Sequence, residues 1–471
     1  MPTLRLRGYY LAMATLGFPI VFDAIVRVGS SWSSGASGVT AIPRLEIGGI
    51  ALRSPLAYYW LVLGFVAAAL LATWGIANSR LGLKLRAIHA DEIAAMARGV
   101  PVVRLKVAAF VISAAIAALS GSLYVHLVQF VAAGTFGLHY SLMLVVMLIA
   151  GGMGRIWGGV AGVVALGWLP ELLRGAASWQ PVIFGGLLAA LMLFVPHGLA
   201  GLVRRRPALR PGAATGEPSP SPAHATTAHG DEVLRVRGLL KRFGGITAVS
   251  GLDFDVHAGQ IRSIIGPNGA GKSTALALIS GALPSEAGSI VLRGAECRAM
   301  PADRRALAGL GRTFQHARLI PSLTVFENIV LGASGRRDTL RASLAVASAM
   351  LDRFALRGVA GRYPDEFNHY QRRLTEIGIA LAADPAVLLL DEPAAGLSNT
   401  EIDRLAQLLR ELRDHGKAIV LVDHIMELVL PLSDRILVLD GGVPIADETP
   451  KAVMADARVR SAYLGRSVAR A

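Results

Sequence analysis

The sequence predicts two unlike parts: an all-α polytopic membrane domain, followed by an α/β domain built around a phosphate-binding loop. Two long runs, 54–79 and 107–154, contain no Asp, Glu, Lys or Arg. Runs of this length are typical of helices that span a bilayer. Farther along, a glycine-rich stretch between an apolar β-branched run and a helical pattern fits G-x-x-x-x-G-K-S/T. We therefore expect a multi-domain chain with a membrane domain over 1–206, a linker over 207–231 and a nucleotide-binding domain over 232–468.

The composition supports this division. Of 471 residues, 53% are hydrophobic and only 17% are charged, which is too apolar for a soluble protein of this size. Residues 1–206 carry 16 Lys and Arg against 5 Asp and Glu, whereas residues 207–471 carry 31 against 28. Because the basic excess lies in the apolar half, it indicates loops beside lipid and not a nucleic-acid-binding surface. The chain has one cysteine, Cys297, so no internal disulfide is possible.

The apolar half predicts about six spans, near 9–27, 55–77, 107–128, 139–154, 157–173 and 181–198. Glycines interrupt the fourth and fifth, where close helix packing and a re-entrant bend both stay open. The basic segments 78–106 and 204–206 are expected in the cytoplasm, which places 28–53 and 129–138 outside. Asp23 and His126 lie nearest the spans and are expected at helix ends in the interface.

The basic loop 78–106 contains a short helix pattern between His89 and Pro101. Asp91 and Glu92 suit its first turn, and Gly99 followed by Pro101 ends it. The pattern resembles the Glu-Ala-Ala loop of ABC importer permeases, which implies a coupling helix that docks on an ATPase. An ordinary solvated loop helix is the alternative. The residues assigned to coupling are Asp91, Glu92, Ala94, Ala95 and Gly99.

The linker 207–231 has prolines scattered among Ala, Ser, Thr, Gly and His, without apolar periodicity. This composition is typical of a flexible tether. His224 and His229 do not have zinc-site spacing with a cysteine, so no metal site is expected there.

The phosphate loop begins directly after the apolar run 261–265 and leads into a predicted helix over 275–279. Its backbone N–H groups and the positive end of that helix would hold the phosphate oxygens of a nucleotide such as ATP. Lys272 would reach the β- and γ-phosphates, and the Ser273 hydroxyl would ligate Mg²⁺. The residues of the loop are Gly266, Pro267, Asn268, Gly269, Ala270, Gly271, Lys272, Ser273 and Thr274.

Two further apolar runs end in polar residues that suit ATP hydrolysis. Asp391 and Glu392 follow a fully apolar run, as expected of a central parallel strand. Asp391 would hold Mg²⁺ through water, and Glu392 would act as general base toward the attacking water. His424 follows the next such run and would contact the γ-phosphate, although a lone histidine is usually just a satisfied polar group. Gln315 is a further candidate ligand of Mg²⁺ and of the attacking water.

The order phosphate loop, Gln315, Asp391-Glu392 and His424 resembles that of an ABC ATPase with its RecA-like core and helical subdomain. In that family an aromatic residue stacks on adenine, and Phe243, before the Gly244-Gly245 turn, matches its place; a core aromatic is the alternative. The stretches 312–319, 391–397 and 462–465 resemble the ATP-binding subunit of branched-chain amino acid importers. The stretches 4–12 and 86–95 resemble the permease of the same systems.

The resemblance implies ATP-driven uptake of branched-chain or hydrophobic amino acids, or related small solutes, across the bacterial inner membrane. The implied partners are a second ABC ATPase subunit, a second permease subunit and a periplasmic solute-binding protein. The ATPase domain would be cytoplasmic. Relatives have further spans before the position that matches Leu4, so we expect an N-terminally truncated permease; a miscalled start, a truncated gene and dispensable spans all stay open as its cause.

One motif departs from the family. The signature that should read Leu-Ser-x-Gly-Gln appears as Phe367-Asn368-His369-Tyr370-Gln371. Its Ser and Gly contact the γ-phosphate on the partner's phosphate loop, and a tyrosine side chain would hinder the backbone approach that glycine permits. This departure leaves open a non-transporting, membrane-tethered nucleotide switch or a decayed remnant. An exporter half is less favoured, because no long intracellular helical extensions are visible.

Overall fold

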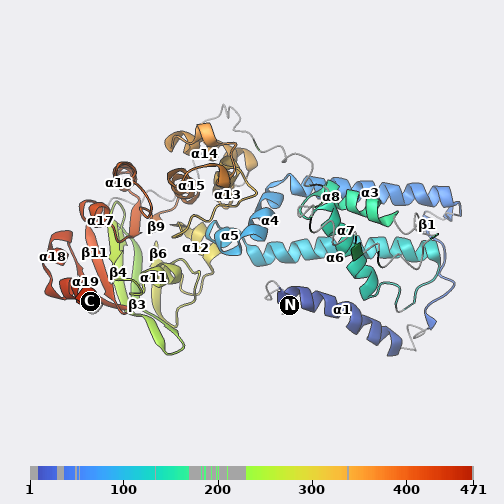
Figure 1. The fold of residues 1–471 in the computed structure, drawn as a ribbon, viewed down its shortest axis with the longest axis horizontal. Helices are drawn as coiled ribbons and strands as arrows, with labels where there is room; N and C mark the ends of the chain where they lie inside the picture. Colours follow the sequence, from blue (N-terminus) through green and yellow to red (C-terminus); the bar gives the residue numbers. More distant parts are fainter. Residues whose placement is uncertain are drawn as a thin grey trace. The chain divides into compact units, whose positions relative to one another are not determined.

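The computed structural model describes residues 9–28, 37–47, 50–51, 53–132, 134–168, 230–336 and 339–468, with isolated residues between 169 and 229. The chain forms two compact units (Figure 1). One contains residues 1–79 and 103–207, and the other contains residues 80–102 and 208–471. Residues 4–8 of the permease-like stretch 4–12, and nearly all of the linker, lie outside the described residues.

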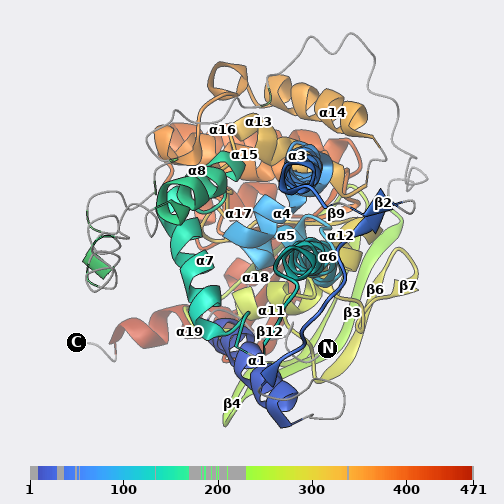
Figure 2. The ribbon, with the colours of Figure 1, turned by 90° about the vertical axis from the view of Figure 1, so that its right-hand side faces the viewer.

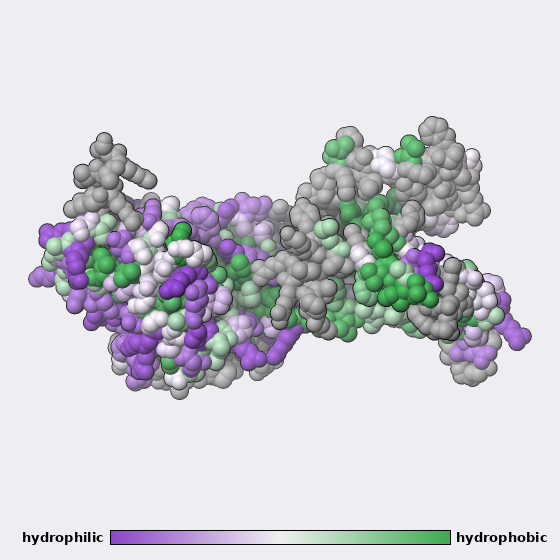
Figure 3. Space-filling model, turned by 90° about the horizontal axis from the view of Figure 1, so that it is seen from below, coloured by the Kyte–Doolittle hydropathy of each residue, from purple (hydrophilic) through white to green (hydrophobic). Residues whose placement is uncertain are grey.

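The first unit is helical and apolar on its surface. Its principal helices are α1 (Tyr9–Val28), α3 (Pro55–Ala77) and α6 (Val102–Val128), the last starting earlier than predicted. Among the described residues, α3 and α6 are long and apolar enough to cross a membrane. Their large side chains are exposed, for example Trp60 at 61% and Leu71 at 68%. On the face seen in Figure 3, hydrophobic residues gather on this unit, whereas the coloured residues of the other unit are mostly hydrophilic.

The helices α7 (Leu138–Gly151) and α8 (Ile156–Gly167) stand where the fourth and fifth spans were predicted. They are bent by 119° at their break, so they form one broken span or a re-entrant loop. Helices of 14 and 12 residues reach only about 21 and 18 Å, which is short of the roughly 30 Å bilayer core. That they are two separate spans stays a prediction. The sixth predicted span, 181–198, lies almost entirely outside the described residues, so the count of six stays a prediction.

Glycines hold α7 and α8 close together. A Cβ on Gly151 would lie 1.9 Å from the Gly158 carbonyl oxygen, and a Cβ on Gly162 would lie 2.0 Å from that of Met147. Both features left open by the sequence, the bend and the close packing, are thus present together.

The two segments predicted on the outer side are bonded to each other. Val39 and Val131 form an isolated antiparallel bridge. His126 Nδ1 lies 2.8 Å from the Pro43 carbonyl oxygen, near the end of α6. A two-strand hairpin, β1 (Glu46–Ile47) and β2 (Ile50–Ala51), follows in the first of these segments. Asp23 pairs with Arg27 at 2.7 Å near the end of α1, so both polar residues lie close to helix ends.

The second unit is built on two sheets. The larger has the order β12-β11-β5-β10-β9-β8, parallel except for the edge strand β12. Its strands are β5 (Ile261–Ile265), β8 (Leu310–Arg312), β9 (Val387–Asp391), β10 (Ala418–Val422), β11 (Arg435–Asp440) and β12 (Val443–Glu448). The fully apolar strands predicted to be central, β9 and β10, are buried along their whole length.

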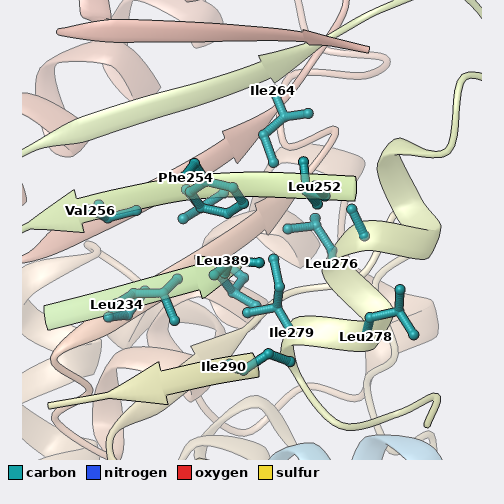
Figure 4. Close-up of a cluster of buried hydrophobic side chains, with 14 of the residues drawn as sticks. Leu234, Leu252, Phe254, Val256, Ile264, Leu276, Leu278, Ile279, Ile290 and Leu389 are labelled. Atoms are coloured by element: carbon teal, nitrogen blue, oxygen red, sulfur yellow. The ribbon is translucent and has the colours of Figure 1, made fainter. Parts of the chain in front are cut away.

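The smaller sheet is antiparallel, with the order β4-β3-β6-β7. Its strands are β3 (Glu232–Phe243), β4 (Ile246–His257), β6 (Ala287–Leu292) and β7 (Ala295–Glu296). The hairpin of β3 and β4 turns at Gly244-Gly245, as predicted. Side chains from both sheets and from helix α11 (Lys272–Ile279) meet in one core, where Phe254, Leu276 and Leu389 are labelled in Figure 4.

The helices of this unit include a group formed by α13 (Val325–Ser334), α14 (Leu340–Arg353) and α15 (His369–Ala382). These three pack on one another, as Figures 1 and 2 show, and they correspond to the predicted helical subdomain. The remaining helices are α4 (Arg80–Ala90), α5 (Glu92–Ala97), α12 (Ala302–Ala308), η5 (Arg357–Val359), η6 (Pro364–Glu366), α16 (Asn399–Asp414), α17 (Met426–Leu432), α18 (Pro450–Ala455) and α19 (Ala457–Val468).

Candidate nucleotide site and its neighbouring contacts

The phosphate loop joins β5 to α11, as the motif requires. Gly266, Gly269 and Gly271 have φ of 154°, 82° and 98°, which side-chain-bearing residues rarely adopt. A Cβ on Gly266 would lie 2.1 Å from the Leu439 carbonyl oxygen, and one on Gly271 would lie 2.2 Å from that of Ala248. The loop therefore depends on glycine at these two positions for its own fold.

Lys272 is the first residue of α11 and its side chain is almost completely buried. Its Nζ donates to the carbonyl oxygens of Gly266 at 2.7 Å and Pro267 at 3.0 Å. Burial lowers the pKa of this ammonium, and the nearby carboxylates of Glu392 and Asp391 oppose that effect. The lysine ammonium is therefore held against carbonyl oxygens of the loop itself.

Three parallel strands, β5, β10 and β9, bring the acidic residues to the same edge as the phosphate loop. Asp391 is the last residue of β9, and its Oδ1 accepts a hydrogen bond from Ser273 Oγ at 3.4 Å. Burial raises the pKa of the Asp391 carboxyl, while the Arg312 guanidinium, 3.9 Å away, favours the ionised form. Ser273 and Asp391, which are 118 positions apart in the chain, thus bring two oxygen atoms close together.

Glu392 and Gln315 meet directly. Gln315 Nε2 donates to Glu392 Oε2 at 2.9 Å. The Glu392 backbone has φ of 46°, and its amide donates to the Val422 carbonyl oxygen at 2.7 Å. A non-glycine residue in this region costs of order 1–3 kcal/mol and persists only where the surroundings fix it. The structure therefore holds the Glu392 backbone in an uncommon conformation beside Gln315.

His424 lies just after β10, and its side chain is 58% exposed. The preceding Asp423 is fully buried and accepts hydrogen bonds from the amides of Ala394, His424 and Ile425. This carboxylate fixes the backbone that carries His424 and joins it to the segment after Glu392. An exposed imidazole on a fixed backbone fits a role toward a bound molecule better than that of a buried polar group.

Phe243 ends β3 beside the hairpin turn, and it is 47% exposed. Lys241 Nζ lies 5.3 Å from the centroid of its ring. This exposure does not fit the core aromatic that was the alternative. Stacking of Phe243 on adenine stays a prediction.

The altered signature forms the start of α15. Asn368 caps this helix: its side-chain oxygen accepts from the Gln371 amide at 2.8 Å, and Gln371 Oε1 accepts from the Asn368 amide at 3.3 Å. Tyr370 is half-buried near Glu401 and Arg404 of α16, and burial raises the pKa of its hydroxyl. His369 Nε2 lies 2.9 Å from the carbonyl oxygen of Ala395, three residues after Glu392.

The predicted coupling helix is present as α5. Asp91 is its N-cap, and Asp91 Oδ1 accepts from the amides of Ile93 and Ala94 at 2.9 and 3.0 Å. Ala94 and Ala95 are fully buried, and α5 packs on α12. Gly99 has φ of 73°, and a Cβ there would lie 2.9 Å from the Leu307 side chain. Glu92 lies in the first turn, as predicted. The segment 80–102 belongs to the same compact unit as residues 208–471, which argues against a solvated loop helix.

Several residues that matter here were not singled out by the sequence. Arg98, Arg373 and Glu376 are buried charged residues beside the Gln315 segment. Arg373 and Glu376 are three positions apart on α15, and that spacing places both on one helix face. That signal alone could not show which segment they contact.

Comparisons with known proteins match both halves of the chain. Residues 249–395 match the family of ABC transporters, and residues 1–196 match the family described as branched-chain amino acid transport system / permease component. The ATP-binding protein LivG of high-affinity branched-chain amino acid transport in Escherichia coli K12 is 36% identical over 251 residues. The match covers 50% of this chain and 98% of LivG.

Two further similarities each cover half of the chain. BraF of Pseudomonas aeruginosa, also a high-affinity branched-chain amino acid transport ATP-binding protein, is 36% identical over 251 residues, which cover 98% of its length. A crystal structure of a nucleotide-free ATP-binding cassette from an ABC transporter is 27% identical, with a TM-score of 0.46, over 50% of this chain and 99% of that one.

Proposed function

Because the chain belongs to the ABC transporter family and joins a branched-chain amino acid permease domain to an ATPase domain, we propose that it drives solute uptake as a fused importer component. The solutes would be branched-chain or hydrophobic amino acids, or related small molecules. One observation carries the proposal. The permease half contributes the helix α5, whose Ala94 and Ala95 are fully buried, to the same compact unit as the ATPase.

The nucleotide would bind at the phosphate loop. The amides of 266–274 and the N-terminus of α11 would hold its phosphates, with Lys272 on the β- and γ-phosphates. Mg²⁺ fits the same place, because Ser273 Oγ and Asp391 Oδ1 lie 3.4 Å apart and Mg²⁺ prefers oxygen ligands together with substrate phosphates. When bound, the ion would neutralise part of the phosphate charge. Phe243, exposed at the end of β3, would stack on the adenine.

Glu392, Gln315 and His424 would act on the attacking water. Glu392 would accept its proton as general base, because its carboxylate follows β9 and its backbone is fixed by the Val422 carbonyl. Gln315, bonded to Glu392 at 2.9 Å, would orient the water. His424 would donate to the γ-phosphate from the fixed backbone beside Asp423.

The ATP-driven closure of two ATPase domains would move α5 and through it the membrane helices. This scheme needs a second ATPase subunit and a second permease subunit, and a periplasmic solute-binding protein would deliver the solute. The basic segment 78–106 favours a cytoplasmic ATPase domain in the bacterial inner membrane. The bridge between Val39 and Val131 and the contact of His126 with the Pro43 carbonyl oxygen join the two segments. These contacts support placing both segments on the same side of the membrane, opposite the ATPase domain.

The first test is native mass spectrometry of the complex, purified from its own host through a tag at the C-terminus. A second ATPase and a second permease in the complex are the expected result. The same preparation, reconstituted with its binding protein, should take up radiolabelled leucine in proteoliposomes only with ATP and Mg²⁺ present.

A homodimer without other subunits would carry two altered signatures. That result, together with ATP binding and no uptake of leucine, isoleucine or valine, would favour the membrane-tethered switch or remnant and overturn the import proposal. The observation that favours this second candidate function is the tyrosine at position 370, where the family signature has glycine.

A further inference from the structure

Arg318, three residues after Gln315, receives two separate contacts from segment 80–102. Its guanidinium Nη1 donates to Asp91 Oδ2 at 2.8 Å, while its carbonyl oxygen accepts from the Nη2 of Arg98. Asp91 therefore uses one oxygen to cap α5 and the other to hold Arg318. The Arg318 guanidinium also lies over the ring of Phe314, 5.0 Å from its centroid.

Arg98 is 7% exposed, which is unusual for an arginine. Burial lowers the pKa of its guanidinium to about 10, and the carboxylates of Glu376 and Asp91 oppose this effect. Arg98 therefore stays protonated at neutral pH. A buried charge of this kind is tolerated only where it is paired and hydrogen-bonded, so its partners are specified by the fold.

Glu376 of α15 holds the same short segment from the other side. Its Oε1 accepts from the Phe314 amide at 3.0 Å and from the Arg318 amide at 3.4 Å. Its Oε2 accepts from Arg373 Nη1 at 3.0 Å, and both side chains are almost completely buried. Removing one partner of such a pair leaves an uncompensated buried charge, which is strongly unfavourable.

Arg373 then connects this segment to the predicted base. Its guanidinium donates to the carbonyl oxygens of Phe314 at 2.8 Å, Gln315 at 3.0 Å and Glu392 at 3.2 Å. One side chain thus fixes the backbones of Gln315 and Glu392, whose own side chains are bonded to each other. Any displacement of 314–318 must stretch bonds to the backbone that carries Glu392.

We propose that Arg318 is a positioning residue that transmits the seating of segment 80–102 to Gln315 and Glu392, through Glu376 and Arg373. The proposal rests on the function proposed above for the roles of Gln315 and Glu392. When Asp91 and Arg98 are bonded to Arg318, segment 314–318 is held against Glu376. Arg373 then keeps the backbones of Gln315 and Glu392 in fixed positions. When this grip on Arg318 is loosened, the backbone of Gln315 gains freedom and hydrolysis slows.

Asp91→Asn tests the grip without removing the helix cap, because Asn caps a helix about as well as Asp. Arg318→Gln removes the other partner. In the purified full complex with Mg-ATP, each variant should lower kcat by about twofold to fivefold, the range of a partly exposed ion pair, with KM unchanged. The double variant should be no slower than the slower single variant, because both remove the same contact.

Asp352→Asn is the matched control. It breaks the ion pair of Asp352 with Arg357, which is exposed and lies elsewhere in the same unit. It should leave kcat and KM unchanged. Two results would overturn the proposal. One is a decrease in kcat in the double variant that equals the product of the two single decreases. The other is a kcat in Asp91→Asn and Arg318→Gln equal to that of Asp352→Asn.

Amide hydrogen exchange gives a second measurement, which does not need transport. The peptide 312–318 should exchange faster in Asp91→Asn and in Arg98→Met, and at the wild-type rate in Asp352→Asn. Unchanged exchange in the first two variants would contradict the proposal. Absence of leucine uptake by the wild type would instead count against the import function, because neither kcat nor exchange depends on the solute.

Discussion

The phosphate loop and the start of α15 are both places where an ABC ATPase is expected to carry glycine, and they differ here. The loop keeps Gly266 and Gly271, where a Cβ would lie 2.1 and 2.2 Å from carbonyl oxygens of the same chain. At the start of α15 the expected glycine is Tyr370, half-buried against α16. The loop glycines are required by the fold of this chain, whereas the family resemblance assigns the signature glycine to contact with a partner's nucleotide.

The altered signature is compatible with an intact helix. Asn368 and Gln371 form a complete capping box, and α15 runs for 14 residues with Arg373 and Glu376 in place. The altered residues therefore still serve the fold of the subunit that carries them. We expect the defect to fall on the nucleotide of the partner and not on the site around Lys272.

The largest expected effect tests the complete site. Glu392→Gln should lower ATP hydrolysis by about 10²- to 10⁴-fold, because the amide cannot accept the proton of the attacking water. ATP binding, measured by titration with a fluorescent nucleotide, should be retained, since the phosphate loop is untouched. Glu411→Gln, at an exposed position of α16, is the control and should change neither quantity. Retained turnover in Glu392→Gln would exclude Glu392 as the base.

The next prediction tests whether the fold itself requires glycine in the loop. In Gly271→Ala the new Cβ would meet the Ala248 carbonyl oxygen at 2.2 Å, with φ at 98°. The strained backbone alone should cost about 1–3 kcal/mol, so both the thermal midpoint and ATP affinity should fall. Gly361→Ala, where no atom lies within 4 Å of the new Cβ, should leave the midpoint within a degree or two of wild type. An unchanged midpoint in Gly271→Ala would remove the contrast with Tyr370.

The sequence was sufficient for features that depend on neighbouring residues. The turn of the phosphate loop, the short helix α5 ending near Gly99 and the hairpin at Gly244-Gly245 all follow from local patterns of glycine and polar side chains, although Asp91, predicted in the first turn of α5, is instead its N-cap. The grip of Arg98 on Arg318 joins residues 220 positions apart, and nothing in either local pattern announces it. Similarly, the glycines of α7 and α8 indicated a close approach, but a charge-free run could not show where the chain bends.

Tyr370→Gly has the smallest expected effect and tests the other side of the comparison. In a complex whose second ATPase has an intact signature, it should raise ATP hydrolysis by about twofold to tenfold, because the partner's nucleotide would regain a backbone approach that the tyrosine ring hinders. Glycine in the first turn of α15 should cost at most about 1 kcal/mol of stability, so the thermal midpoint should fall only slightly. Tyr370→Phe keeps the ring without the hydroxyl and should match the wild type. If Tyr370→Gly leaves hydrolysis by the complex unchanged, the altered signature does not impair the partner's site. The tyrosine at position 370 would then have no effect on ATP hydrolysis.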